Sequence, residues 1–301
     1  MTWSRGKDYY LLNIRIKHSN FSYDYFSLNN PHKLVIDISL HDEKNSKEDK
    51  ILKGKEVLRK EEPRKEFPSR SSREIKTVVI DPGHGGLEIG AKGKFGTAEK
   101  DITLDISFKL KAIIERNLAF RVVMTREKDI DISLDNRTAI ANNNRADLFI
   151  SVHANSSYRK EASGPETFFL SQKATDEEAR RLAYLENNSA ELEEGIDREN
   201  EEEIQMILWD MAQASYLRQS SQLAESIQKE LNLLLGTTDR GIKQAPFKVL
   251  AGVACPAVLV EVAFLSNADE EKKLGTEEFQ SNVAQAVFQG LVNYLKLHSQ
   301  E

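Results

Sequence analysis

Three apolar runs of strand length each lead to a residue that can bind a metal ion or move a proton. The first run leads to His84, the second ends at His153, and the third encloses Glu261. In α/β folds, functional sites form at the carboxyl ends of parallel strands. We therefore expect these three side chains to point toward one edge of a sheet. The glycines of Asp-Pro-Gly-His-Gly-Gly allow the backbone to turn sharply around His84 and leave room for a ligand.

Strand and helix patterns alternate from residue 75 onward. The helix expected at residues 101–116 places Ile102, Ile106, Leu110 and Ile113 on one face. Such alternation predicts an α/β fold with a mostly parallel central sheet that is flanked by helices on both faces. The expected strands are residues 75–80, 120–125, 147–153, 166–170 and 258–262, and the other expected helices are residues 133–144 and 279–297.

The composition divides the chain into three parts. Residues 1–42 are a short β-rich segment, and residues 43–73 carry 18 charged residues among 31, which is typical of a solvated linker. Residues 74–298 form the α/β domain. A polar, helical insertion at about residues 172–232 interrupts the alternation in this domain.

Composition excludes several classes of protein. The net charge of −6 provides no basic surface for nucleic acid, and the one cysteine, Cys255, permits neither an intramolecular disulfide nor a thiolate zinc site. No stretch approaches the roughly 20 apolar residues of a membrane span. The first residues contain no signal peptide, which indicates a cytosolic chain, although a mature form without its export signal would look the same.

The metal-competent residues form a recognisable set. His84, Glu99 and His153 supply two imidazoles and a carboxylate, which is a ligand set of catalytic zinc sites that keep a fourth position for water. Zinc would lower the pKa of such a water toward ~7 and polarise a carbonyl group. Taken singly, His84 could be a hydrogen-bonding turn residue and Glu99 a carboxylate that favours a helix dipole. The joint arrangement favours the metal site.

Glu261 is a carboxylate within an otherwise apolar strand. Burying it without a partner would be costly, so this residue needs a role or a partner. One hypothesis is a general acid and base beside the metal. The alternative is an ion pair with Arg126 or Arg137.

The motifs closely resemble those of a known family. DPGHGG, a glutamate before a helix, TREKD, LDNRTAIANNNRADLFISVHAN and PAVLVEVAFLSN occur in this order over residues 75–297. In this they are similar to the zinc-dependent N-acetylmuramoyl-L-alanine amidases, the peptidoglycan amidases of the amidase-3 type. The resemblance implies zinc bound by His84, Glu99 and His153. One departure is Ala263, where the family often has glycine.

The resemblance also implies a reaction, with Glu261 as the catalytic carboxylate. The expected reaction is hydrolysis of the amide that joins N-acetylmuramic acid to L-alanine of the stem peptide, during separation of daughter cells. Arg137 and Asn155 match recurrent positions of the family and are expected to be structural or adjacent to the substrate. Peptidoglycan is the expected partner, the protein is expected to be a monomer, and its expected location is periplasmic or extracellular.

Two other functions remain open at this stage. The chain could be a non-catalytic peptidoglycan-binding or scaffold protein, or it could be a zinc peptidase that cuts another bond of the stem peptide. Retention of all four residues of the set counts against the first alternative. Only the resemblance disfavours the second.

The insertion resembles the regulatory region of cell-division amidases, in which a helix plugs the zinc groove until a protein activator moves it. This resemblance implies a regulatory helix at about residues 190–215, with Glu201, Glu202 or Glu203 in the open zinc position. The apolar residues Ile204, Ile207, Leu208 and Met211 have helical spacing and are expected to dock on the domain or on the activator. At the other end of the chain, YFSLNNPHKLVIDIS resembles the end of an AMIN domain, a β-rich targeting module.

Overall fold

The computed structural model describes residues 75–188, 216–236 and 239–298, together with Lys17 and the backbone of four strands nearer the N-terminus. The chain divides into two compact units, Met1–Ser69 and Arg70–Glu301. In the first unit, β1 pairs with β2 and β3 pairs with β4, both antiparallel. The resemblance of this segment to an AMIN domain stays a prediction, and the expected linker lies outside the described residues. These strands are β1 (Thr2–Arg5), β2 (Tyr10–Asn13), β3 (Phe21–Asn29) and β4 (His32–Leu40).

The second unit is built on a six-stranded sheet with the order β6-β5-β7-β10-β8-β9. Every pairing in this sheet is parallel except that of β10 with β8. The expectation of a mostly parallel sheet is therefore confirmed. The strands are β5 (Thr77–Pro82), β6 (Arg121–Met124), β7 (Leu148–Asn155), β8 (Glu166–Leu170), β9 (Ile242–Ala245) and β10 (Ala257–Phe264).

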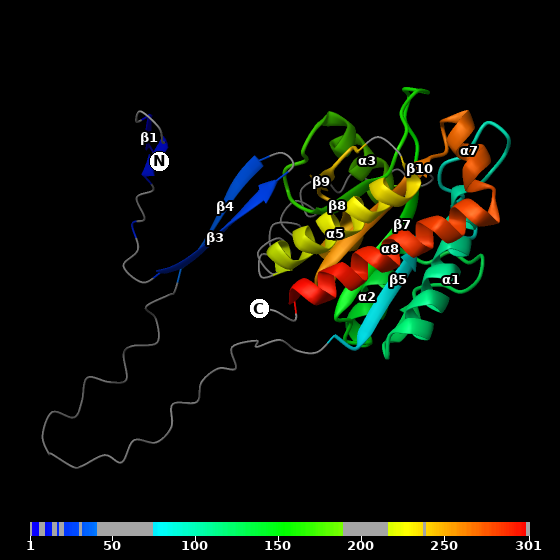
Figure 1. Ribbon diagram of the computed structural model, residues 1–301, viewed down its shortest axis with the longest axis horizontal. Coiled ribbons are helices and arrows are strands. Elements are labelled where there is room, and N and C mark those ends of the chain that lie inside the picture. The colour runs from blue at the N-terminus through cyan, green and yellow to red at the C-terminus, as the bar shows by residue number, and fades with distance from the viewer. Residues whose placement is uncertain are drawn as a thin grey trace, which may run out of the picture. The chain divides into compact units, whose positions relative to one another are not determined.

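Helices cover both faces of this sheet, which explains why the central strands are apolar on both sides. On one face α5 packs against α8, and α8 packs against α1 (Figure 1). On the other face α2, α3 and α6 surround a core of buried side chains that includes Phe149, Phe168 and Leu259. The helices are α1 (Glu99–Asn117), α2 (Leu134–Asn143), α3 (Glu177–Asn187), α5 (Leu217–Leu235), α6 (Lys248–Ala251), α7 (Ala268–Leu274) and α8 (Glu277–His298).

The three expected helices at residues 101–116, 133–144 and 279–297 are present as α1, α2 and α8. Helix α1 begins two residues earlier than expected, at Glu99, and its N-cap is Ala98, which makes no side-chain capping bond. Glu99, expected to lie just before this helix, is therefore its first residue. Strand β9 was not expected, since its four residues, Ile-Lys-Gln-Ala, lack a strand pattern.

Helix α5 lies at the C-terminal end of the range expected for the insertion. Its residues Leu223, Ile227 and Leu231 are fully buried, and the helix packs on α8 and β8. This helix is thus part of the layer that covers the sheet. In the described residues, no helix has both the length and the apolar character needed to cross a membrane.

Gly290 marks the close contact between α8 and α5. A Cβ atom at this position would lie 2.5 Å from Cα of Ile227 and 2.9 Å from its nitrogen. Alanine stabilises a helix interior by about 1 kcal/mol relative to glycine, but overpacking against another element typically costs about 1–3 kcal/mol. We expect Gly290→Ala to lower the free energy of unfolding and the Tm, as measured by thermal denaturation.

The matched control is Gly275→Ala. Gly275 has φ −73, and the nearest atom to an added Cβ lies at 3.6 Å, so alanine fits without strain. We expect Gly275→Ala to leave the Tm unchanged or to raise it slightly. Equal Tm values for the two variants would contradict the close packing of α8 on α5.

Candidate metal centre

His84 lies in the loop after β5 and is held in an uncommon backbone conformation, with φ 58. The Arg137 guanidinium stabilises this loop by donating to the His84 carbonyl over 2.8 Å. On the ring, Nδ1 lies 2.6 Å from Oε1 of Glu88, whereas the buried Nε2 makes no hydrogen bond. The ring therefore presents Nε2 toward the interior of the site, where a ligand can use it.

Two glycines make room for the histidines. A Cβ atom at Gly83 would lie 2.4 Å from Cε1 of His153. One at Gly90, where φ is +67, would lie 2.5 Å from the His84 ring and 2.6 Å from the Glu99 carboxylate. No other residue type fits at either position without displacing a side chain of the site.

Glu99 joins the two histidines. Its carboxylate lies 3.0 Å from His153 Nδ1 and 3.1 Å from His84 Nε2, and it accepts hydrogen bonds from the backbone nitrogens of Ala91 and Ala154. Burial alone would raise the pKa of Glu99, but the charges of His84 and His153 and the hydrogen bonds with their rings hold the pKa well below its usual range. The carboxylate is thus ionised and fully oriented.

A fourth side chain, Glu186 of α3, completes the cluster. Its Oε2 lies 3.3 Å from His153 Nδ1 and 3.4 Å from His84 Nε2. The ligand atoms of His84, Glu99, His153 and Glu186 all lie within 4.8 Å of one another, and this group could hold a metal ion.

The charges around the cluster also favour the binding of a cation. Burial would lower the pKa of His84, but the carboxylates of Glu99 and Glu186 and the hydrogen bond with Glu88 outweigh burial and raise the pKa well above its ordinary value. The carboxylates therefore stabilise positive charge at this point. A divalent cation supplies that charge, and His84 Nε2 is a buried atom that lacks a hydrogen-bond partner and can bind it.

Glu261 stands beside the cluster on β10. Its Cα is paired with that of His153 on β7 and with that of Glu166 on β8. The side chain is 1% exposed, and neither carboxyl oxygen has a hydrogen-bond partner. Burial, together with the nearby carboxylates of Glu99 and Glu186, raises the pKa of Glu261 well above its ordinary value.

The hypothesis of an ion pair between Glu261 and Arg126 or Arg137 is wrong, because both arginines bind elsewhere. Arg137 forms a buried ion pair with Asp81 at 2.9 Å and donates to three backbone carbonyls, so its role is structural. Arg126 also donates to backbone carbonyls, and burial lowers its pKa to about 10. The arginines brace the loop that carries His84 and leave Glu261 without a cation partner among the described residues.

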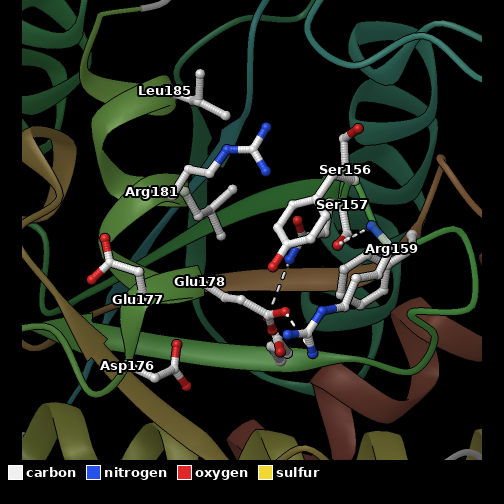
Figure 2. Close-up of a pocket in the computed structure, with 13 residues that line it drawn as sticks. Ser156, Ser157, Arg159, Asp176, Glu177, Glu178, Arg181 and Leu185 are labelled. Carbon is white, nitrogen blue, oxygen red and sulfur yellow. Dashed lines mark hydrogen bonds and ion pairs between the residues drawn. The ribbon is translucent and has the colours of Figure 1, made fainter.

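Asn155 follows His153 by two residues and lies in a different environment. Its Nδ2 donates to the buried carboxylate of Glu166 over 3.1 Å. Asn155 and Glu166 line a pocket of about 500 Å³ between the loop after β7 and the N-terminal half of α3 (Figure 2). This position agrees with the expectation that Asn155 is adjacent to the substrate, which stays a prediction.

Two residues of the site were missed by sequence reasoning. Glu88, which contacts the Nδ1 atom of His84, could have been suspected from its position four residues after that histidine. Glu186 gave no signal, because it is one acidic residue among many in a polar helical segment. The expected contacts Glu201, Glu202 and Glu203 lie outside the described residues, as does the whole of the regulatory helix expected at about residues 190–215.

Comparisons with known proteins show which family the chain resembles. The family model described as N-acetylmuramoyl-L-alanine amidase matches residues 78–293. The chain is 35% identical to the amidase AmiC of Escherichia coli O6:H1 over 228 residues, which cover 75% of this chain and 55% of AmiC. It is 34% identical to AmiA of Escherichia coli K12 over 220 residues, which cover 73% of this chain and 76% of AmiA. The chain thus spans about half the length of AmiC.

Solved structures show the same fold. An N-acetylmuramoyl-L-alanine amidase from Clostridium difficile 630 is 30% identical, with a TM-score of 0.56 over 74% of this chain and 98% of that one. The catalytic domain of CwlV from Bacillus (Paenibacillus) polymyxa is 32% identical, with a TM-score of 0.54 over 74% of this chain and 99% of that one. The CwlD amidase from Clostridioides difficile, solved in complex with the GerS lipoprotein, is 28% identical, with a TM-score of 0.56 over 74% of this chain and 99% of that one.

Glu88 is expected to orient His84 for metal binding. Residues that hold the second nitrogen of a metal-binding histidine typically contribute about 10–100-fold to metal affinity. We expect Glu88→Ala to weaken Zn²⁺ binding by a factor in this range, measured by competition with a chromophoric chelator. As the control, Glu127→Ala removes a carboxylate that is paired with Lys111 on the surface, and the affinity should not change. Equal affinities in the two variants would exclude the orienting role of Glu88.

Proposed function

We propose a function from the fact that this chain belongs to the N-acetylmuramoyl-L-alanine amidase family. The proposed reaction is the zinc-dependent hydrolysis of the amide between N-acetylmuramic acid and L-alanine of peptidoglycan. One observation carries the proposal. The nitrogens of His84 and His153 and the carboxylate of Glu99 converge beside Glu261, a carboxyl group that is buried and has no hydrogen-bond partner.

The metal would be held by His84, Glu99 and His153. Two imidazole nitrogens and a carboxylate are donors that favour zinc, whereas magnesium and calcium favour oxygen donors alone. When bound, zinc supplies a Lewis acid that polarises a carbonyl group and lowers the pKa of water. The chain itself contributes preorganised ligands, since Glu88 contacts the second nitrogen of His84 and two backbone nitrogens bind Glu99.

Glu261 is proposed as the residue that moves protons. As general base it accepts a proton from the water that attacks the amide carbonyl, and as general acid it returns a proton to the amine of L-alanine when the carbon–nitrogen bond breaks. Its burial and its lack of any fixed partner among the described residues suit this exchange. Asn155, at the end of the neighbouring strand, is proposed to lie next to the bound substrate.

We further propose that the described arrangement is an autoinhibited one. Helix α3 carries Glu186 to the histidines, and the cavity bounded by His84, His153 and Glu186 has a volume of only about 10 Å³. Such a cavity holds one water molecule at most. An amide group with its flanking residues does not fit there, so α3 has to move before peptidoglycan can bind.

The end of α3 is anchored next to Glu186. Asn187 donates from Nδ2 to the carbonyl of Pro246 over 2.8 Å, and its Oδ1 accepts from the backbone nitrogen of Lys248 over 2.7 Å.

We propose that a protein activator releases this contact by binding the segment after α3, where the sequence predicts the regulatory helix at about residues 190–215. The complex of the related CwlD with a lipoprotein supports a protein partner. Such an enzyme would act in daughter-cell separation, in the periplasm or outside the cell.

The role of Glu261 can be tested by Glu261→Gln, which keeps the size of the side chain and removes the base. We expect hydrolysis of dye-labelled peptidoglycan to slow by about 10²–10⁴-fold. The zinc content should stay near one per chain, since Glu261 is outside the proposed ligand set. Wild-type activity in this variant would overturn the role of Glu261, and mass spectrometry of the wild-type products shows whether the amide or another stem-peptide bond is cut.

Autoinhibition can be tested by Glu186→Ala in the full chain. Loss of one buried contact worth about 1–2 kcal/mol shifts a two-state equilibrium roughly 5–30-fold, so basal peptidoglycan hydrolysis should rise by a factor in this range. The control is Glu177→Ala on the same helix, where the side chain is 82% exposed and contacts Arg180. If Glu186→Ala hydrolyses peptidoglycan no faster than the control, Glu186 does not block the site.

A further inference from the structure

The pocket of about 500 Å³ next to the metal centre has an unusual charge arrangement. It lies where the N-terminal half of α3 faces the loop after β7, and Figure 2 shows side chains from both segments pointing into it. Asn155 and Glu166 belong to its lining. Asn155 follows His153 by two residues, and Glu166 on β8 is paired with Glu261 on the neighbouring strand β10, so the pocket lies next to the proposed catalytic residues. The lining also includes Arg159 from the loop after β7, and Asp176 and Glu178 from the start of α3.

Cations of the domain body hold the carboxylates of α3 at this pocket. Arg240 contacts Glu178 of α3 at 3.2 Å, and Arg159 contacts the same carboxylate at 3.4 Å. Lys243 contacts Asp176, the N-cap residue of α3, at 3.1 Å. These three ion pairs all join α3 to the rest of the domain.

Among the residues that the structure describes, Arg240 and Lys243 have one carboxylate partner that does not move with α3. Glu166 is 3% exposed and binds both Arg240 and Lys243, with Lys243 at 2.9 Å. When α3 withdraws, as release from autoinhibition requires, Asp176 and Glu178 leave with it. Arg240 and Lys243 are then left to share the single carboxylate of Glu166. Two largely buried cations that share one carboxylate leave positive charge uncompensated, so the vacated pocket favours an anionic ligand.

The spacing along α3 matches a short extended peptide. Glu178 and Glu186 are eight residues apart, which corresponds to about 12 Å along a helix. An extended peptide spans the same length in between three and four residues, at roughly 3.3–3.6 Å each. A stem peptide with its first amide at the metal centre would therefore bring a carboxylate of its third or fourth residue to the cations that now bind Glu178.

We propose that α3 is a pseudosubstrate, and that Arg240 and Lys243, with Arg159, form a subsite for a free carboxylate of the stem peptide. Glu186 occupies the position of the scissile group, and Glu178 and Asp176 occupy the positions of peptide carboxylates. The inference rests on the proposed function, because it requires that α3 leave the site. It adds the residues that recognise the peptide and the chemical group that they recognise.

The experiment uses two substitutions that break the same ion pair. Glu178→Gln and Arg240→Gln both remove the ion pair between Glu178 of α3 and Arg240. If this ion pair only held α3 in place, either substitution would weaken the attachment of the helix and both would change peptide binding in the same direction. A carboxylate subsite responds in opposite directions, because Glu178 competes with the peptide whereas Arg240 binds it. Both substitutions are made in the full chain carrying Glu186→Ala, which leaves the cations of the pocket intact.

The probe is a synthetic stem tetrapeptide with free carboxylates, and its counterpart has every carboxylate converted to an amide. Binding is measured by isothermal titration calorimetry. We expect Glu178→Gln to tighten binding of the free peptide severalfold, and Arg240→Gln to weaken it at least about tenfold, the effect of one charge-assisted hydrogen bond. The amidated peptide should bind more weakly than the free peptide to the Glu186→Ala parent. The matched control Glu127→Gln, which removes a surface carboxylate paired with Lys111 outside the pocket, should bind both peptides as the parent does.

Three outcomes would overturn the proposal. These are tighter binding in both variants, equal binding of the free and the amidated peptide, and no binding of either peptide at millimolar concentration. Circular dichroism checks folding, and Lys243→Met repeats the second arm if Arg240→Gln unfolds. Because peptide binding needs no hydrolysis, a chain that binds as expected but cuts no peptidoglycan would refute the proposed function and leave the subsite intact.

Discussion

A single buried carboxylate holds the candidate metal centre together. Glu99 contacts His84 and His153 and accepts hydrogen bonds from Ala91 and Ala154, and thereby joins the first turn of α1 to the loop after β5 and to the end of β7. A buried charge is tolerated only when its oxygens are paired. The positions of these three elements relative to one another are consequently tightly constrained, and Gly83 and Gly90 provide the space in which the histidines meet.

Contacts between carboxylates and positive groups also hold α3 in place. Its carboxylates contact positive groups at two places, with Glu186 between the histidines and with Glu178 and Asp176 on Arg240 and Lys243. The helix thus depends on charge together with a small apolar face, Ala179, Leu182 and Ala183, whereas α5 buries the larger side chains of Leu223, Ile227 and Leu231 completely. A helix held by ion pairs can exchange with an anionic ligand at much smaller cost than a helix held by a buried apolar face. This difference supports α3 as the mobile element and α5 as a fixed one.

Much of the fold and part of the site could be predicted, because both follow from local pattern. The apolar strands and amphipathic helices are periodic, and parallel strands bring His84, His153 and Glu261 to one edge of the sheet. Strand β9 and the contact of α5 with α8 were not predicted, since a four-residue edge strand has little pattern and since a polar helix can pack on one narrow face. Glu186 was missed for a different reason. A helix pattern does not show which of many glutamates will lie next to a site that is distant in the sequence.

The sequence by itself determined the α/β class and the family, and it supplied the residues proposed for the chemistry, because strand ends and motif spacing are local properties of the chain. Only the tertiary structure decided which partners those residues have. It excluded an ion pair between Glu261 and Arg126 or Arg137, brought Glu88 to His84, and brought Glu186 between the two histidines. Ion pairs of this kind depend on side chains from elements far apart in the sequence, so their identity is set by packing.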